Sequence, residues 1–312
     1  MASAVGKVVI LGTGGTIAGT AAHAGDNVGY TAAQIGVAGL VAAVPPLGGW
    51  PIEAEQVAQI DSKDMTLAVL QRLAQRAQFH LDRDEVAGVV VTHGTDTLEE
   101  TAYALHRVLR VAKPVVLTAA MRPATALQAD GPQNLLDAVT VAKTAAQAGV
   151  VAVLGGRVWA GCDLRKVHSY RIDAFSASDA GALGWIEEGR LQAARPWPSA
   201  AGLGVAALPA DERDAPWVAI VTSHAGAGER EVDGLVAGGV RGLVVATTGN
   251  GTIHASLDRA LRRAQQAGVA VLRASRCAFG GIVGDTPGAF DAAGALTPAQ
   301  ARIELMLRLH AA

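Results

Sequence analysis

The 312-residue sequence has little of what several large protein classes require. Two cysteines, Cys162 and Cys277, are too few for a disulfide framework and lack the spacing of metal ligands. Basic residues number 26 against 28 acidic ones, without a long basic run, so we expect no nucleic-acid surface. The segment 1–7 leads into an apolar run too short for a signal-peptide core or a membrane span, which favours a cytoplasmic protein.

Aromatic residues are also scarce, at 4% of the chain, although half of the residues are apolar. The core must therefore consist mainly of alanine, valine, leucine and isoleucine. That composition suits buried parallel strands covered by alanine-rich helices. Because the chain is about twice the usual length of one domain, we expect a larger domain followed by a smaller one.

Short apolar runs alternate with stretches of helical periodicity along the first part of the chain. Ala102, Leu105 and Leu109 illustrate the helical spacing. The apolar runs lie at residues 8–11, 89–91, 115–117 and 150–154. This alternation predicts an α/β fold, in which a parallel sheet is flanked by helices and ligands bind beyond the carboxyl ends of the strands.

A change in composition suggests the domain boundaries. Residues 196–216 are rich in proline, alanine and glycine with mixed charge, which is typical of a linker. We therefore predict an N-terminal α/β catalytic domain at residues 1–195 and a smaller C-terminal α/β domain at residues 217–312.

The C-terminal part repeats the alternating pattern. Its apolar runs at 218–221, 243–245 and 269–272 alternate with helix-like stretches at 231–237 and 254–267. The last helix has a clear predicted start, because Thr297 offers an N-cap hydroxyl, Pro298 suits the first turn, and Gln300 is placed for a capping box.

The turn at residues 12–16, Gly-Thr-Gly-Gly-Thr, follows the first apolar run. Its glycines suit either a phosphate cradle at a helix start or a tight structural turn. It is not a dinucleotide fingerprint, because Ile17 occupies the position of the third glycine. A purely structural turn gives no reason for the flanking Thr13 and Thr16, so both interpretations stay open.

A second turn, at residues 92–101, follows the second apolar run in the same way. Thr97 and Glu100 have the spacing of a capping box, which predicts a structural role for both. Thr95 and Asp96 are not needed for that cap. A carboxylate at a helix N-terminus stays ionised, so Asp96 is suited to bind an ammonium group.

Two further side chains have competing interpretations. His93 suggests a catalytic triad, but without a Ser-x-Gly elbow nearby we predict a hydrogen-bonded structural group. Lys166 follows the run at 150–154 and is either a solvated surface residue or a base beside Thr95. Spacing alone does not separate these two alternatives for the lysine.

Taken together, these segments resemble the bacterial-type L-asparaginases, amidohydrolases of the asparaginase/glutaminase family that use threonine nucleophiles. Order and spacing match over nearly the whole chain, and the pairing of TGGTIAG with HGTDT is highly specific. The matching segments are residues 13–19 (TGGTIAG), Tyr30, 61–65 (DSKDM), 92–97 (THGTDT), 120–123 (AMRP), 129–132 (ADGP) and Lys166.

The resemblance implies roles for five residues. Thr16 is the nucleophile, on a mobile N-terminal loop that also carries Tyr30. Thr95 and Lys166 assist proton transfer and the attacking water. Asp96 holds the α-ammonium group of the substrate. The logic is chemically consistent, since amide hydrolysis needs a nucleophile, a proton acceptor and donors aimed at the developing oxyanion.

The resemblance also implies the binding groups around the substrate. Ser62 binds the α-carboxylate, and the backbone N–H groups of Gly15 and Thr95 form the oxyanion hole. Ala120 offers its carbonyl to the leaving ammonia. Neither a metal ion nor an organic cofactor is implied.

The sequence departs from the family pattern at three positions. Lys63 stands where many members have glutamine, and its cation would repel the substrate ammonium unless it pairs with Asp64, Asp96 or another carboxylate. Thr252 follows a Gly-Asn-Gly turn where many members contribute asparagine or serine from the neighbouring subunit. Asp285 is the candidate for the glutamate that secreted-type members supply from the C-terminal domain.

These observations predict an L-asparagine amidohydrolase that releases L-aspartate and ammonia through an acyl-threonine intermediate. One alternative is a glutaminase-asparaginase of broad specificity, and another is a non-catalytic protein that binds amino acids or nucleotides. The expected partner is a small amino-acid amide, rather than nucleic acid or a membrane. By resemblance, the protein is a homotetramer of tight dimers with each site completed at the dimer interface.

Overall fold

The computed structural model describes residues 6–200, 202–284 and 287–311, and the chain divides into two compact units. The first unit ends at Ala206 and the second begins at Ala207, inside the segment 196–216. Within that segment Trp197 belongs to the core of the first unit, and Leu208 is buried. Among the described residues, none of the helices combines the length and apolarity needed to cross a bilayer.

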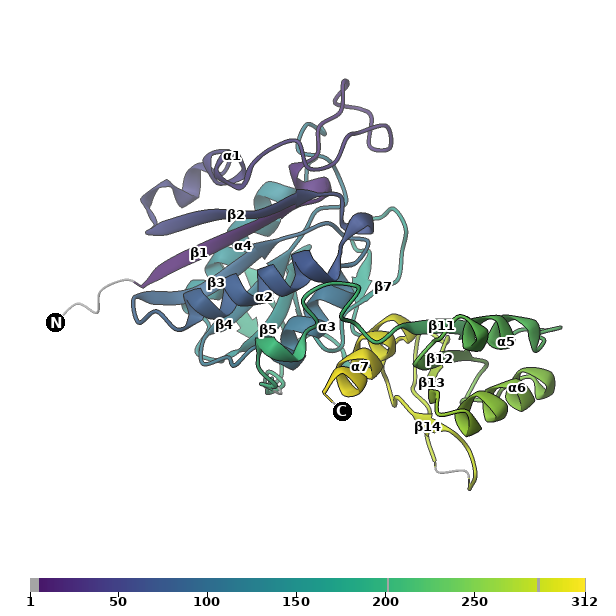
Figure 1. The fold of residues 1–312 in the computed structure, drawn as a ribbon. Helices are drawn as coiled ribbons and strands as arrows, with labels where there is room; N and C mark the ends of the chain where they lie inside the picture. Colours follow the sequence, from purple (N-terminus) through teal and green to yellow (C-terminus); the bar gives the residue numbers. More distant parts are fainter. Residues whose placement is uncertain (1–5, 201, 285–286, 312) are drawn as a thin grey trace. The chain divides into compact units, whose positions relative to one another are not determined.

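The first unit is built on an eight-stranded sheet with the strand order β10-β9-β6-β5-β4-β3-β1-β2. Its strands β1 to β5 are labelled in Figure 1. Its strands are β1 (Lys7–Gly14), β2 (Ile52–Ile60), β3 (Val86–Thr92), β4 (Pro114–Thr118), β5 (Gly149–Leu154), β6 (Arg157–Ala160), β9 (Gly184–Glu187) and β10 (Arg190–Ala193). Strands β1 to β5 run parallel, and β6, β9 and β10 continue the sheet antiparallel from β5. The four predicted runs form β1, β3, β4 and β5, and the predicted α/β class is confirmed.

Helices cover both faces of this sheet. Helix α4 (Gly131–Thr144) and the short α1 (Val37–Ala42) pack on one face, where Ile10, Val90 and Val116 belong to the same core cluster. Helices α2 (Leu67–Leu81) and α3 (Leu98–Val108) lie over the other face (Figure 1). Both faces of the central strands are therefore buried, which explains why their sequences are continuous apolar runs.

Short elements connect the strands and helices. They are the 3-10 turns η1 (Thr16–Ala18), η2 (Pro45–Gly49), η3 (Ser62–Asp64), η4 (Ser178–Ala180) and η5 (Val205–Ala207), together with a hairpin of β7 (Arg165–Lys166) and β8 (Phe175–Ser176). Turn η1 follows β1, and η3 follows β2. The chain thus places two polar turns at adjacent strand ends.

The second unit has a parallel sheet in the order β11-β12-β13-β14. Its elements are β11 (Val218–Thr222), α5 (Arg230–Ala237), β12 (Gly242–Thr247), α6 (Ala255–Gln266), β13 (Ala270–Ser275), β14 (Asp291–Ala292) and α7 (Pro298–His310). The predicted strands and helices of this region are confirmed. The capping box is confirmed too, because Gln300 N donates to Thr297 Oγ1 at 3.1 Å and Thr297 N donates to Gln300 Oε1 at 3.1 Å.

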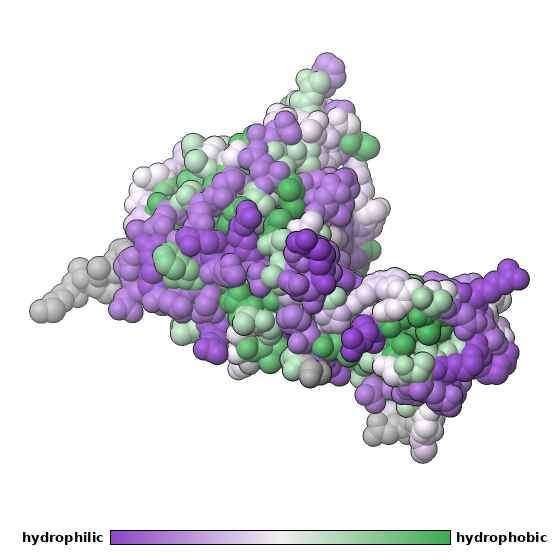
Figure 2. All heavy atoms as spheres, in the orientation of Figure 1, coloured by the Kyte–Doolittle hydropathy of each residue, from purple (hydrophilic) through white to green (hydrophobic). Residues whose placement is uncertain are grey.

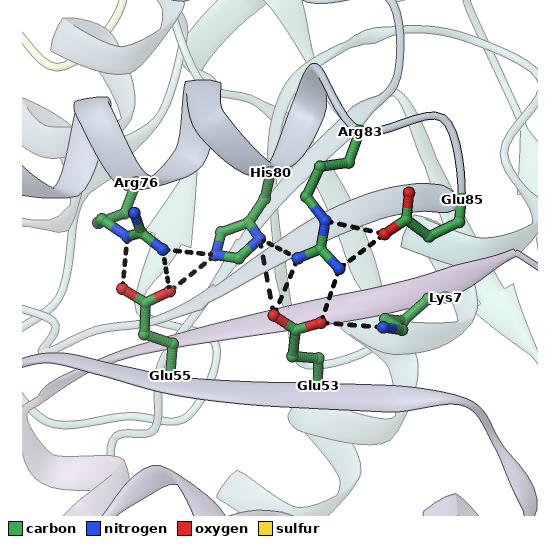
Figure 3. Close-up of polar contacts among 7 residues, drawn as sticks. All are labelled: Lys7, Glu53, Glu55, Arg76, His80, Arg83 and Glu85. Carbon is green, nitrogen blue, oxygen red and sulfur yellow. Dashed lines mark hydrogen bonds and ion pairs between the residues drawn. The ribbon is translucent and has the colours of Figure 1, made fainter.

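A network of charged side chains joins the edge strand β2 to helix α2. This β2 charge cluster consists of Lys7, Glu53, Glu55, Arg76, His80, Arg83 and Glu85 (Figure 3). Arg76 donates to both oxygens of Glu55, and Arg83 donates to both oxygens of Glu53, at 2.6 to 3.0 Å. The surface over α2 is accordingly mainly hydrophilic (Figure 2).

The partners in the cluster determine the state of its buried imidazole. Arg83 donates to His80 Nδ1 at 2.8 Å, so the other ring nitrogen, Nε2, is assigned the proton that is donated to Glu55 at 2.7 Å. Hydrogen bonds from Arg83 and Lys7 lower the pKa of Glu53 to about 2. Arg76 similarly lowers the pKa of Glu55. The cluster therefore compensates its charges internally.

Candidate active site

The two predicted threonine turns touch each other through glycine backbones. Gly14 and Gly15 have φ angles of +103° and +81°, a region that favours glycine. A Cβ atom built on Gly15 would clash with the Cα and N atoms of Gly94, so only glycine permits this approach. Thr13 Oγ1 also donates to Thr92 O at 3.0 Å across the two turns. The residues that follow the touching glycines therefore emerge close together.

Thr16 opens η1 directly after Gly15 and is buried. Its Oγ1 atom lies 2.7 Å from the Tyr30 hydroxyl. Tyr30 is held at this position by a short antiparallel bridge, in which Thr20 and Thr31 exchange backbone hydrogen bonds of 2.9 Å. The loop that carries Tyr30 is thus closed at its base, and the nucleophile predicted from the sequence has a hydroxyl partner.

Lys166 reaches the second turn from the β7–β8 hairpin. Its Nζ atom donates to Thr95 Oγ1 at 2.9 Å and to Asp96 Oδ1 at 2.6 Å. The lysine side chain is one-fifth exposed, whereas that of Asp96 is 54% exposed. Of the two interpretations of Lys166, the structure supports the one that places it beside Thr95. The exposed carboxylate of Asp96 can accept an external cation.

Ser62 lies at the end of β2 and packs against the same turn. Asp96 N donates to Ser62 Oγ at 3.2 Å, and Thr97 Oγ1 donates to Ser62 O at 2.8 Å. The predicted capping box of Thr97 and Glu100 is wrong, because Thr97 occupies the N-cap without a side-chain cap bond. Its hydroxyl is used on Ser62 instead, so a local pattern is overridden by a tertiary contact.

The predicted oxyanion donor Gly15 also needs correction. Its N–H donates to Ile60 O at 2.9 Å and is therefore engaged within the protein in this conformation. Sequence spacing does not reveal that bond, because it arises from the pairing of β1 with β2. The observed contribution of Gly15 is the close packing against Gly94.

His93 is completely buried between the second turn and α3. Its Nδ1 donates to Gly94 O at 2.7 Å, and Thr101 Oγ1 lies 3.0 Å from Nε2, which leaves Nε2 as the acceptor. Burial lowers the pKa of His93 to about 4. The prediction of a hydrogen-bonded structural histidine is confirmed, and the neutral ring fixes the peptide that joins Gly94 to Thr95.

Lys63 directly follows Ser62, and its positive charge is compensated by the next residue. Its ammonium pairs with the carboxylate of Asp64, and that hydrogen bond raises the pKa of Lys63. Pairing with Asp64 is one of the arrangements that the sequence left open. The repulsion that an isolated cation would exert on an incoming ammonium group is reduced accordingly.

Ala120 is buried two residues after β4, in a turn that is held by two side chains of the α4 region. Asp130 accepts from the backbone N–H groups of Met121 and Arg122 at 2.9 and 3.0 Å. Asn134 Nδ2 donates to Ala119 O at 2.9 Å. The sequence predicted no role for Asp130 or Asn134, although Asp130 lies in the ADGP segment that matches the family.

The remaining predicted positions belong to the second unit. Asn250 exchanges hydrogen bonds with the backbone of Val283 at 2.8 and 3.0 Å, which orders the Gly-Asn-Gly turn. Thr252 Oγ1 lies 2.7 Å from Thr248 Oγ1. Asp285 lies outside the described residues. The two cysteines form no disulfide.

The described residues contain no group of three histidine, cysteine or acidic side chains that would suit a metal ion. What the first unit does assemble is two hydroxyls with separate partners, a lysine and an exposed carboxylate. Such an arrangement can supply a nucleophile, proton transfer and recognition of an ammonium group.

Comparisons with known proteins agree with this chemistry. Residues 7–198 match the family "Asparaginase, N-terminal", and residues 217–312 match "Glutaminase/Asparaginase C-terminal domain". The chain is 38% identical to L-asparaginase 2 of Escherichia coli (strain K12), covering 99% of this chain and 90% of that protein. It is 36% identical to the glutaminase-asparaginase of Pseudomonas fluorescens biotype A, covering 89% and 77%.

A solved structure is similar along almost the whole chain. The crystal structure of a probable cytoplasmic L-asparaginase from Campylobacter jejuni superposes with a TM-score of 0.90 at 35% identity, and the match covers 97% of this chain and 95% of that one. With two matching family domains and full-length relatives of this similarity, the chain belongs to the asparaginase family of amidohydrolases.

Proposed function

We propose that this protein hydrolyses the side-chain amide of L-asparagine to L-aspartate and ammonia through an acyl intermediate on Thr16. The observation that carries the proposal is the contact between the two glycine turns, which brings together two threonines with different partners. Thr16 is paired with Tyr30, and Thr95 is paired with Lys166. Each half of a two-step hydrolysis therefore has its own hydroxyl.

In the first step the Thr16 oxygen attacks the amide carbon. The Thr16 proton leaves along the 2.7 Å hydrogen bond to Tyr30, whose hydroxyl accepts one proton while donating its own toward the departing amine. The N–H of Thr95 faces the developing oxyanion, since the opposite end of that peptide is held by His93. The C–N bond breaks, and ammonia leaves past the carbonyl of Ala120.

In the second step a water molecule attacks the acyl-threonine. Thr95, held by Lys166, orients that water, and its proton is relayed to the Thr16 oxygen as the ester bond breaks. Aspartate is then released, and the enzyme regains its starting protonation. The 2.9 Å contact between Lys166 Nζ and Thr95 Oγ1 supports this assignment.

The charged ends of the substrate are recognised by groups at the rim. The exposed carboxylate of Asp96 binds the α-ammonium, and Ser62 binds the α-carboxylate. The pairing of Lys63 with Asp64 keeps the lysine from opposing that ammonium. Few polar groups are needed, because a small zwitterion is oriented by one carboxylate and a few donors.

Ammonia release from L-asparagine by the wild type, Thr16→Ala and Thr95→Ala tests the mechanism. Removal of a nucleophile that acts within a catalytic unit costs up to about 10⁶-fold in kcat, and loss of assisted proton transfer costs about 10² to 10⁴-fold. Undiminished turnover in both variants would overturn the proposal. Calorimetry on the wild type addresses the non-catalytic alternative, which requires tight binding of an amino acid or nucleotide without turnover.

A glutaminase-asparaginase of broad specificity is the second candidate, because similar proteins carry that name. Its substrate differs from asparagine by one methylene, which usually changes discrimination by about 10 to 200-fold. A ratio of kcat/KM for the two amides within about threefold would favour the broad enzyme. A larger ratio toward asparagine would favour the narrow one.

We also propose a homotetramer of tight dimers with each site completed at the dimer interface, where Thr252 is the candidate residue from the neighbouring copy. Analytical ultracentrifugation checks the assembly, and a monomer would contradict it. We assign the protein to the cytoplasm, because the similar Campylobacter jejuni protein is described as a probable cytoplasmic L-asparaginase. The Haemophilus influenzae relative is named a probable periplasmic L-asparaginase, so cell fractionation is the deciding measurement.

A further inference from the structure

Lys166 is attached to the first unit through a short hairpin that is separate from the main sheet. It lies on β7, a two-residue strand whose pairing partner is β8 rather than a strand of the eight-stranded sheet. Within this hairpin Val167 N donates to Ala174 O at 2.7 Å. Neighbouring N–H groups in an antiparallel strand point to opposite sides, so the N–H of Lys166 points away from β8.

That N–H donates to Glu99 Oε2 at 2.7 Å. Glu99 is in the first turn of α3, the helix that begins two residues after Asp96. The two ends of the lysine are therefore held by one short segment. Its backbone is held by Glu99, and its Nζ is held by Thr95 and Asp96.

We propose that Glu99 is a positioning residue that sets the place of Lys166 relative to Thr95. The inference rests on the proposed function, in which Lys166 acts on the Thr95 hydroxyl. Lysine has a flexible four-carbon stem, so the region that Nζ samples depends on where the backbone is anchored. A displacement of about 1 Å in such a site costs up to about 10²-fold in rate.

The contact with the Lys166 N–H is not a general consequence of having an acidic residue in the first turn of α3. Glu100 lies in the same first turn and shares the favourable interaction of an acidic residue with the helix N-terminus. The carboxylate that reaches the lysine backbone across 67 positions of sequence is that of Glu99. Glu100 therefore provides a matched control for the charge and helix contributions.

Two substitutions at Glu99 separate the effect of side-chain length from the effect of charge. Glu99→Asp keeps the charge but shortens the side chain by one methylene, so its carboxylate no longer meets the Lys166 N–H at bonding distance. Glu99→Gln keeps the length and an oxygen acceptor but removes the charge. We expect Glu99→Asp to lower kcat for asparagine by about 10 to 100-fold with KM within about twofold, and Glu99→Gln to stay within about threefold of wild type.

Glu100→Asp and Glu100→Gln should both keep the wild-type kcat. The inference is overturned if Glu99→Asp retains full kcat, if Glu99→Gln loses as much as Glu99→Asp, or if Glu100→Asp loses as much as Glu99→Asp. Thermal melts show which variants are folded, and the nearly isosteric Glu99→Gln keeps the comparison open if the shorter side chain unfolds the protein.

A structural measurement separates this inference from the proposed function. If the wild type releases no ammonia from asparagine, the proposed function fails while the positioning role is still decided by a crystal structure of Glu99→Asp. We expect the Lys166 Nζ to Thr95 Oγ1 separation to lengthen beyond hydrogen-bond distance in that variant. A separation unchanged from 2.9 Å would overturn the positioning role.

Discussion

Strands β1 and β2 connect two polar regions of the first unit that differ in chemistry. At their amino ends lies the β2 charge cluster, where Lys7 and Glu53 belong to a network of matched cations and carboxylates (Figure 3). Beyond their carboxyl ends lie hydroxyls, glycine turns and the partly exposed pair of Lys166 and Asp96. Parallel strands collect like ends at one edge, so one sheet builds both regions.

The comparison teaches that polar density alone does not identify a site. In the β2 charge cluster the carboxylates accept hydrogen bonds from neighbouring guanidinium groups, which lowers the pKa of Glu53 and Glu55. In the site, Asp96 is more than half exposed and can therefore meet a ligand. A cluster whose partners are all internal stabilises the fold, whereas an exposed group on a rigid frame is available to bind.

The largest expected contrast comes from replacing one lysine in each of the two polar regions. Lys166→Met should lower kcat for asparagine by about 10² to 10⁴-fold, because the Thr95 hydroxyl loses its partner. Lys7→Met removes a cation of the β2 charge cluster and should leave kcat unchanged. Steady-state kinetics on both variants measure this contrast. Equal losses would mean that the two polar regions are not functionally distinct.

The next effect concerns the backbone contact that joins the turns. Gly15→Ala introduces a side chain at a φ of +81° and against the backbone of Gly94, so we expect destabilisation of about 1 to 3 kcal/mol and a fall in kcat/KM of at least about 10-fold. Gly25→Ala is the matched control, because a Cβ there meets no atom within 4 Å. Urea unfolding and kinetics measure both, and equal behaviour of the variants would contradict the contact.

A smaller effect should appear in the pH dependence of stability. The folded-state pKa of His93 is about 4, below the ordinary value of 6.5, so the unfolded chain binds its proton first as the pH falls. Stability is lost between pH 6.5 and 4, by about 2 kcal/mol at pH 5 from this group. His93→Gln should flatten that slope in urea titrations. An unchanged slope would show that other groups cause it.

The smallest effect belongs to the β2 charge cluster. Because the pKa of Glu53 is lowered to about 2, its contribution to stability is present above pH 4.5 and is lost as the pH falls toward 2. Glu53 is about one-third exposed, so solvent screening limits this contribution to about 1 kcal/mol. Glu53→Gln should therefore be less stable at pH 7 and approach the wild type near pH 2. A constant difference across this range would contradict the assignment.

Local sequence patterns predicted much of the frame and parts of the site. Buried parallel strands such as β3 appear as continuous apolar runs, which made their positions visible. The edge strand β2 was not predicted, because its partly exposed face carries charges such as Glu53 and Glu55. The short antiparallel strands β6, β9 and β10 were missed as well. Each of these strands is only a few residues long, so its sequence pattern is weak.

The errors at the site have one cause. Thr97 has the spacing of a helix cap, yet its hydroxyl donates to Ser62, which is 35 positions away in the sequence. Gly15 was expected to offer its N–H to the substrate, yet Ile60 accepts that bond. In both cases a hydrogen-bond partner brought close by folding takes the place of the expected one, and the neighbouring sequence does not reveal that partner.

The sequence by itself determined the α/β class, the two hydroxyl-bearing turns and, through motif resemblance, the set of side chains at the site. Only the tertiary structure decided that Lys166 meets Thr95 and Asp96 and that Glu99 holds the backbone of that lysine. The physical reason is the sequence separation over which each kind of interaction acts. Periodicity and turn chemistry act over a few neighbouring residues, whereas these hydrogen bonds join segments that meet only when the sheet, α3 and the β7–β8 hairpin have assembled.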